Sequence, residues 1–176
     1  MDLFGVIRCK RLILRPLRAG DSQAIAHGIG QWQVIRWLTT PPWPYTQADA
    51  EWFLNDPMSA ETFGIEVDGA LIGVVGLHGN DDSAGPELGY WLDRDHHGKG
   101  YMTEAAQAVV ADHFARRDES LQSGHLVGNA ASANVLSKLG FRNTAVITRF
   151  ARPVGYDVPL QRMELTKADW LARGAA

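Results

Sequence analysis

The sequence contains a single cysteine, Cys9, so it cannot form an internal disulfide. A lone cysteine fits a reducing compartment, and without a second cysteine nearby it predicts no structural zinc site. No stretch approaches the ~18 consecutive apolar residues of a membrane span. The first residues, Met1–Arg11, also lack the apolar core of a secretory signal. We therefore expect a cytoplasmic protein with no metal cofactor and no membrane partner.

A surplus of one charge sign is also missing. The chain has 17 Lys and Arg against 20 Asp and Glu, a net charge of −3, which gives no electrostatic argument for a nucleic-acid partner. Hydrophobic residues make up 45% and charged residues 21%, and this balance excludes a mainly disordered chain. A length of 176 residues suits one ordinary domain with its own core. We therefore predict a single domain over residues 1–176.

Apolar periodicity and turn residues predict alternating strands and helices. Asp68-Gly69 between two apolar runs is a strong signal for a two-residue hairpin turn. Gly28 and Gly30 interrupt the first helical pattern, and Gly140 is placed to end a later helix. This order fits one mixed α+β sheet covered by helices. The expected elements are strand 11–16, helices after residue 21, over 31–37 and after Thr46, strands 63–67, 70–77 and 87–92, helix 101–117, strand 121–127, helix 129–139, and strands 145–150 and 158–165.

A glycine-containing turn, 95–100, joins the strand at 87–92 to the longest predicted helix. Glycine allows successive backbone N–H groups to point outward, and the first amides of a helix lack internal partners, so such a turn suits a pyrophosphate. A P-loop fits poorly, because Lys99 stands between the glycines and no Ser or Thr follows it. A Rossmann fingerprint also fits poorly, because Thr103 takes the place of the third glycine. Spacing alone leaves an ordinary strand–helix turn equally open.

Three longer segments, 87–92, 97–105 and 129–141, occur in this order and resemble the GCN5-related N-acetyltransferase (GNAT) superfamily. Together with 11–16 and 157–159, they resemble more narrowly its branch of ribosomal-protein N-terminal acetyltransferases. The resemblance implies a mixed α+β fold with a central, mostly antiparallel twisted sheet of about six to seven strands flanked by helices. It also implies direct transfer of the acetyl group of acetyl-CoA to a primary amine, without a metal.

The same resemblance assigns the cofactor-binding residues. Backbone around Trp91, Leu92 and Asp93 should pair with the pantetheine arm, as an added strand would. Asn129 and Asn134 match family positions that contact the cofactor, although helix capping and simple helix polarity also explain them. The backbone expected to hold the pyrophosphate comprises Gly98, Lys99, Gly100, Tyr101, Met102 and Thr103.

One position of the pyrophosphate motif departs from the family. Asp95 stands where the family has Arg or Gln, so we expect its side chain to point away from the phosphates or to cap the turn.

Acetyl transfer to an amine requires a neutral amine, and a base assists its deprotonation. Glu87 is the candidate base, with a solvent-facing strand residue as the plainer alternative. Many relatives use a tyrosine as the acid that protonates the thiolate, but Leu136 occupies that position here. By the same resemblance, the adjacent Ser137 is the candidate acid, because a serine at this position is proposed for that role in the ribosomal branch; thioester binding and simple exposure are the alternatives. A backbone amide between Tyr90 and Leu92 is the expected oxyanion donor.

The acceptor is the least determined element. Four tryptophans could wall its site, although core filling is expected for at least two of them. The adjacent pair His96-His97 predicts no metal site, because adjacent rings rarely reach one ion. The acceptor is a protein N-terminal α-amine, or a small molecule such as an amino acid, polyamine or antibiotic. A catalytically weak acyl-CoA-binding sensor domain is the alternative class. In either case the protein is expected to be a monomer or a homodimer. The tryptophans are Trp32, Trp37, Trp43 and Trp52.

Overall fold

The computed structural model describes residues 5–56, 61–79 and 85–173, which form an eight-stranded sheet in the order β1-β2-β3-β4-β5-β6-β8-β7. Every neighbouring pair is antiparallel except β5 and β6, which are parallel. The mixed, mostly antiparallel fold is therefore confirmed. The strands are β1 (Ile7–Arg8), β2 (Ile13–Pro16), β3 (Thr62–Val67), β4 (Ala70–His78), β5 (Glu87–Leu92), β6 (Leu121–Leu126), β7 (Arg142–Ala151) and β8 (Tyr156–Leu165).

The expectation of six to seven strands was too low, because β1 adds one more. This strand has two residues and is defined only by its pairing with β2, so it carries no alternating pattern that a sequence could reveal. The final helix, α6, was also not predicted. The helices are α1 (Ser22–Ile29), α2 (Trp32–Ile35), α3 (Gln47–Asn55), α4 (Tyr101–Arg116), α5 (Ala130–Leu139) and α6 (Lys167–Arg173), with short 3-10 helices η1 (Ala19–Asp21) and η3 (Arg94–His96).

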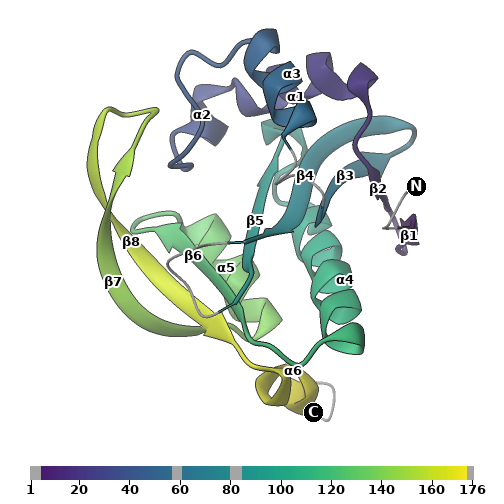
Figure 1. Ribbon diagram of the computed structural model, residues 1–176, viewed down its shortest axis with the longest axis vertical. Coiled ribbons are helices and arrows are strands. Elements are labelled where there is room, and N and C mark those ends of the chain that lie inside the picture. The colour runs from purple at the N-terminus through teal and green to yellow at the C-terminus, as the bar shows by residue number, and fades with distance from the viewer. Residues whose placement is uncertain (1–4, 57–60, 80–84, 174–176) are drawn as a thin grey trace.

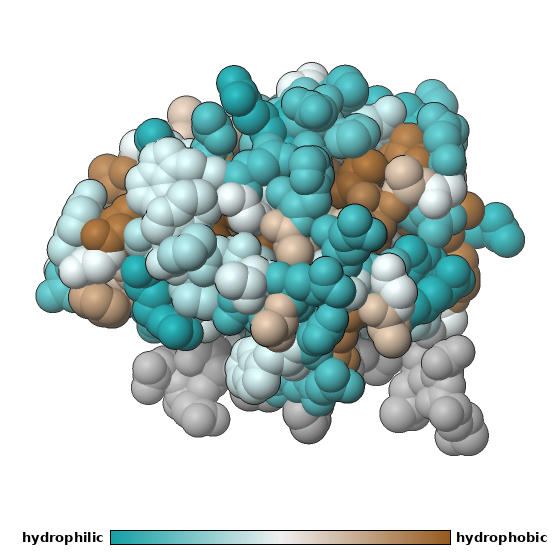
Figure 2. All heavy atoms as spheres, turned by 90° about the horizontal axis from the view of Figure 1, so that it is seen from above, coloured by the Kyte–Doolittle hydropathy of each residue, from teal (hydrophilic) through white to brown (hydrophobic). Residues whose placement is uncertain are grey.

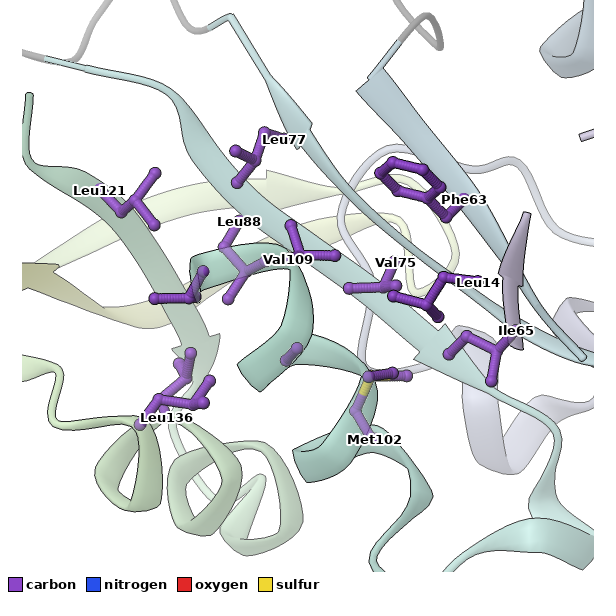
Figure 3. Close-up of a cluster of buried hydrophobic side chains, with 14 of the residues drawn as sticks. Leu14, Phe63, Ile65, Val75, Leu77, Leu88, Met102, Val109, Leu121 and Leu136 are labelled. Carbon is purple, nitrogen blue, oxygen red and sulfur yellow. The ribbon is translucent and has the colours of Figure 1, made fainter. Parts of the chain in front are cut away.

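The helices cover the sheet on two sides (Figure 1). Successive strand residues point to opposite faces, and β4 shows this directly. Val75 joins a large core with α4 and α5, whereas its neighbour Val74 joins a smaller core with α1–α3. The larger core contains fully buried aliphatic side chains from both the sheet and the helices, including Leu121 and Leu136 (Figure 3). None of the described helices is long and apolar enough to cross a membrane.

Several local predictions are confirmed by backbone geometry. Asp68 and Gly69 both have positive φ, 50° and 81°, as the two-residue hairpin turn requires. Thr46 caps α3, since its hydroxyl accepts the Asp49 amide and the Asp49 carboxylate accepts the Thr46 amide. Gly140 ends α5 in the left-handed conformation, with φ 92°.

The predicted interruption at Gly28 is wrong, because α1 continues through this residue. A Cβ at Gly28 would lie 2.6 Å from Cζ3 of Trp91, so the missing side chain allows α1 to pack directly on that indole. Gly28 therefore serves close packing between helix and sheet and does not end the helix.

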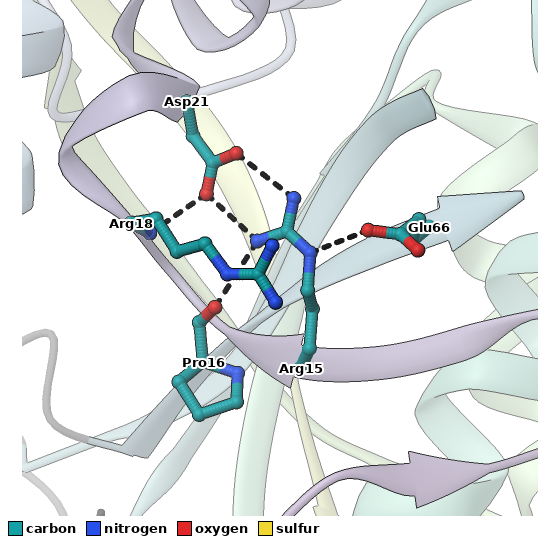
Figure 4. A network of polar contacts seen from close by, with 5 residues as sticks. All are labelled: Arg15, Pro16, Arg18, Asp21 and Glu66. Carbon is teal, nitrogen blue, oxygen red and sulfur yellow. Dashed lines mark hydrogen bonds and ion pairs between the residues drawn. The ribbon is translucent and has the colours of Figure 1, made fainter. Parts of the chain in front are cut away.

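A buried ion-pair network fixes α1 against β2 and β3 (Figure 4). The Arg15 guanidinium donates to both carboxylate oxygens of Asp21, at 2.8 and 2.9 Å, and its Nε donates to Glu66 at 2.6 Å. The Asp21 carboxylate also accepts the Arg18 amide at 2.7 Å. Burial raises the pKa of Asp21, but the bonds from Arg15 and Arg18 outweigh it and hold the pKa below its ordinary value.

Candidate functional site

Strands β5 and β6 pair at one position only, Glu87 with Gln122, and then diverge. On its other side β5 is paired with β4 along its whole length, and β6 is paired likewise with β8. The two parallel strands therefore form a fork, defined here as residues 88–92 and 123–126, whose closed end lies at Glu87 (Figure 1). The fork interrupts the sheet at its centre.

The direction of the β5 peptide groups follows from one hydrogen bond. The Asp93 amide donates to the Ile72 carbonyl at 2.8 Å, so the peptide groups of Asp93 and, by alternation, Trp91 are turned toward β4. Those of Leu88, Tyr90 and Leu92 are turned toward β6 and the fork. Of the three residues predicted to pair with pantetheine, only Leu92 thus directs its peptide N–H into the fork.

The glycine turn lies just beyond the open end of β5. Gly98 and Gly100 have φ values of 74° and 79°, which glycine adopts without strain, and α4 begins at Tyr101. The first internal bond joins the Glu104 amide to the Gly100 carbonyl at 3.1 Å. Among the residues that the structure describes, the six backbone amides from Gly98 to Thr103 find no acceptor within the chain. These amides and the positive end of α4 fit a diphosphate.

The side chains of the turn contribute little to that site. Met102 is buried in the larger core, and the Lys99 ammonium donates to the Asp95 carbonyl at 2.9 Å. The exposed Asp95 does not cap the turn, because the cap is made by Asp93, whose carboxylate accepts the Asp95 amide at 2.9 Å. Phosphate recognition in this turn would therefore rest on its backbone.

Helix α5 presents different side chains on its two sides. Asn129 caps the helix, since its Oδ1 accepts the Ser132 amide at 3.2 Å. Leu136 is fully buried in the larger core, whereas Asn134 and Ser137 are exposed. The position where many relatives have a tyrosine is thus filled by a core leucine.

A hydroxyl pair that the sequence does not predict connects α5 to β5. The Tyr90 hydroxyl lies 2.8 Å from Oγ of Ser132, in the first turn of α5. Burial raises the pKa of Tyr90 to about 12, so its phenol keeps its proton at physiological pH and can act as a hydrogen-bond donor. The position of Tyr90 in the strand could have revealed this pair. Tyr90 lies on the same face of β5 as Leu88 and Leu92, both of which join the core beneath α4 and α5.

Glu87 lies at the closed end of the fork, on the opposite face of the sheet from Leu88. Its carboxylate forms an ion pair with Arg162 of β8, with 3.0 Å between Oε2 and Nη1, and 28% of the Glu87 side chain is exposed. His78 pairs with Glu87 across β4 and β5, and its ring lies against Gly89. A carboxylate, an imidazole and a guanidinium therefore gather on this face.

The α1–α3 side of the molecule carries exposed tryptophans. The rings of Trp32 and Trp43 lie 5.1 Å apart and are 38% and 43% exposed, while Trp52 is 70% exposed and Trp37 is partly buried. The expectation that at least two of the four fill the core is wrong, because aliphatic residues of α1–α3 and Trp91 fill it instead. Seen from this side, hydrophilic atoms predominate and hydrophobic ones form separate patches (Figure 2).

The tip of the β7–β8 hairpin reaches the loop that follows α2. Arg152 donates its amide to the Thr39 carbonyl at 2.9 Å and its Nη1 to the Thr40 carbonyl at 3.2 Å. These bonds bring the hairpin beside the segment that carries Trp43.

Within the described residues, no group of three or more His, Cys, Asp and Glu side chains is arranged to hold a metal ion.

Comparison of the sequence with known families covers the segments that form this forked sheet and glycine turn. The model of the acetyltransferase (GNAT) domain matches residues 11–142, well over half of the chain. The chain belongs to the GNAT acetyltransferase family. Enzymes of this family use acetyl-CoA as the acetyl donor.

Individual relatives agree with this membership of the GNAT family. YdaF of Bacillus subtilis (strain 168), a candidate ribosomal N-acetyltransferase by name, is 26% identical over 160 residues, covering 75% of this chain and 78% of its own. A GNAT-family acetyltransferase from Bacillus anthracis superposes with a TM-score of 0.81 at 21% identity, covering 93% and 99% of the two chains. Mycobacterium smegmatis RimJ, solved with CoA-disulfide, gives 0.76 at 21% identity, covering 96% and 94%. The names of YdaF and RimJ support the resemblance to the ribosomal branch.

Proposed function

We propose that this GNAT acetyltransferase transfers the acetyl group of acetyl-CoA directly to a primary amine, and that the amine is the N-terminal α-amine of a protein. One observation carries the first part of the proposal. The fork between β5 and β6 leads to a turn whose six consecutive amides, Gly98 to Thr103, have no acceptor among the described residues. An extended arm that ends in a diphosphate is complementary to both features.

The residues that would hold acetyl-CoA follow from this arrangement. The amides of Gly98, Lys99, Gly100, Tyr101, Met102 and Thr103 would bind the diphosphate. The peptide group of Tyr90 and the Leu92 amide would pair with the pantetheine arm, while the Leu92 carbonyl accepts from Nε2 of His97 at 2.8 Å. Trp91 and Asp93 would hold β5 in place through β4. Asn129 and Asn134, on the first two turns of α5, would approach the arm from the other side of the fork. When bound, acetyl-CoA supplies an activated acyl thioester.

The candidate groups for proton transfer in the proposed reaction lie on opposite faces of the sheet, with Glu87 on one and Tyr90 on the other. A new C–N bond forms as the C–S bond breaks, so the amine loses one proton and the departing thiolate gains one. Glu87 would receive the amine proton, directly or through a water molecule. A hydroxyl would protonate the thiolate. The Tyr90–Ser132 pair faces the fork and is better placed for that role than the exposed Ser137, which stays the second candidate.

Two observations support the α-amine as acceptor. YdaF, whose name describes a ribosomal N-acetyltransferase, is similar in sequence over 75% of this chain, and RimJ, solved with CoA-disulfide, shares its fold. An α-amino group has a pKa near ~8 against ~10.4 for lysine, so more of it is neutral at physiological pH. A small-molecule amine is the second candidate, favoured by the exposed Trp32–Trp43 pair, which suits a compact apolar ligand.

The test is release of free thiol from acetyl-CoA in the presence of a panel of amines. The panel contains a peptide with a free N-terminus, the same peptide with a formylated N-terminus and one internal lysine, a polyamine and a free amino acid. We expect turnover on the free N-terminus alone, with background hydrolysis subtracted. Turnover on the small amines alone would favour the second candidate. Tight binding of acetyl-CoA with no turnover on any acceptor would overturn the enzymatic proposal and leave a sensor domain.

A further inference from the structure

Arg11, just before β2, reaches across to the glycine turn and the first turn of α4. Its amide and its Nε donate to the two carboxylate oxygens of Glu104, each at 2.8 Å. Its Nη1 donates to the Lys99 carbonyl at 2.7 Å, and its guanidinium carbon lies 4.9 Å from the centre of the Tyr101 ring. Three side-chain contacts and one backbone hydrogen bond therefore hold Arg11 against the turn and the start of α4.

One edge of the guanidinium remains available. Nη2 of Arg11 lies 3.3 Å from the position that a Cβ would take at Gly100, and no acceptor for it exists among the described residues. The side chain is 44% exposed, so a ligand can approach it. The cation therefore lies directly beside amides that have no acceptor among the residues that the structure describes.

A cation beside the turn would strengthen a phosphate site made of backbone amides, and the turn's own lysine is directed elsewhere. Lys99 directs its ammonium to the Asp95 carbonyl, and the Asp95 carboxylate adds a negative charge nearby. A guanidinium offers a rigid, permanently charged pair of donors that suits phosphate oxygens. Glu104 accepts from Nε of Arg11, which fixes the orientation of the guanidinium and leaves Nη2 uncovered.

We propose that Arg11 is a phosphate-binding residue of the acetyl-CoA site, contributed by the N-terminal segment. The proposal rests on the proposed use of acetyl-CoA and adds the residue that supplies the positive charge. A phosphate oxygen at the turn accepts from Nη2 of Arg11 together with the turn amides. The contacts to Lys99 and Glu104 position the guanidinium for this bond.

The test is calorimetric binding of CoA and 3′-dephospho-CoA to the full chain and to Arg11→Met. The matched control is Arg142→Met, which removes the same charge and another arginine–carboxylate pair, with Asp169, near the far end of α4. We expect Arg11→Met to raise the Kd of CoA by about 10- to 100-fold, and the difference to shrink as salt is added. The control should stay within about twofold of wild type, as expected for an exposed surface ion pair.

The second ligand identifies which phosphate is contacted. An equal loss with 3′-dephospho-CoA places Arg11 on the diphosphate, and a loss confined to CoA places it on the 3′-phosphate; either result supports the proposal. A Kd for Arg11→Met equal to that of the control would overturn it.

Glu104→Gln tests whether Arg11 has only a structural role, because this variant keeps the Arg11 guanidinium and weakens the ion pair that holds it against α4. If Arg11 only braces the turn, Glu104→Gln and Arg11→Met will weaken CoA binding equally, and the proposal fails. If Arg11 binds phosphate, Glu104→Gln weakens binding less. Should Arg11→Met not fold, Arg11→Lys gives the same comparison, with an intermediate loss expected. Wild-type protein that binds CoA but acetylates no amine would refute the proposed function while leaving the Arg11 comparison intact.

Discussion

Replacement of Gly98 by aspartate places a negative charge where the diphosphate of acetyl-CoA is proposed to lie. Gly98 has φ 74°, and a Cβ built on it would meet nothing within 4 Å. The change therefore creates no steric overlap in the free protein. Its cost to folding is the left-handed backbone, about 1 kcal/mol for a side chain such as Asp that tolerates this region.

The effect on binding is expected to be much larger than the effect on folding. A unit charge about 4 Å from a phosphate costs about 4 kcal/mol at an effective dielectric constant of about 20. That energy corresponds to a rise in Kd of about 10³-fold. Gly155 provides a matched control, because it has φ 79° and equally open surroundings in the β7–β8 turn. Gly155→Asp adds the same charge and the same strain away from the site.

The assay is thermal unfolding with and without CoA. At a CoA concentration of about 100 times the wild-type Kd, ligand stabilisation is about 2.7 kcal/mol. For a chain of this length the Tm should rise by about 5 to 11 °C. Gly155→Asp should keep this rise, whereas Gly98→Asp should show almost none while unfolding at nearly the same temperature as the control without ligand. A full CoA-dependent rise in Gly98→Asp would refute the assignment of the turn.

Three further changes test the catalytic residues and the support of α1. Glu87→Gln should lower kcat by about 10²- to 10⁴-fold and leave the Kd of CoA almost unchanged, because it removes a proton acceptor; an unchanged kcat would exclude Glu87 as the base. Tyr90→Phe should lower kcat by about 2- to 10-fold, since the Ser132 hydroxyl loses its partner, and a rate equal to wild type would exclude this pair from proton transfer. Asp21→Asn should lower the free energy of unfolding by about 3 kcal/mol at neutral pH, because the buried Arg15 loses a counter-ion. The folded pKa of Asp21 is lowered, so its stabilisation is complete above about pH 4 and is lost as the pH falls through the folded value; denaturation curves of wild type and variant that already coincide at pH 6 would contradict this.

Features set by a few consecutive residues could be predicted from the sequence. The Asp68-Gly69 turn, the Thr46 cap and the end of α5 at Gly140 depend on local backbone angles and on bonds between near neighbours. The glycine turn before α4 belongs to the same class, because Gly98 and Gly100 adopt the positive φ values that only glycine takes easily. The family motifs could be identified in the sequence because each is a short run of consecutive residues.

Features that depend on contacts between distant segments could not be predicted. The sequence predicts that Gly28 interrupts a helix, but its role depends on the Trp91 ring that packs against it. At least two of the four tryptophans (Trp32, Trp37, Trp43 and Trp52) were expected to fill the core, but the space beneath α1–α3 is taken by aliphatic residues and Trp91. Strand β1 and its pairing with β2 carry no periodic signal, and they exist only because β2 offers an edge.

The sequence by itself determined that a glycine turn with outward amides precedes a long helix, and through its motifs that the chain is an acetyltransferase. The tertiary structure decided what surrounds that turn. The fork is open because β5 and β6 pair only through Glu87 and Gln122. The fold also brings Arg11 into contact with Lys99 and Glu104, which lie 88 and 93 positions later in the sequence. Local rules fix backbone angles within a few residues, whereas such contacts depend on how the packed sheet and helices place distant segments together.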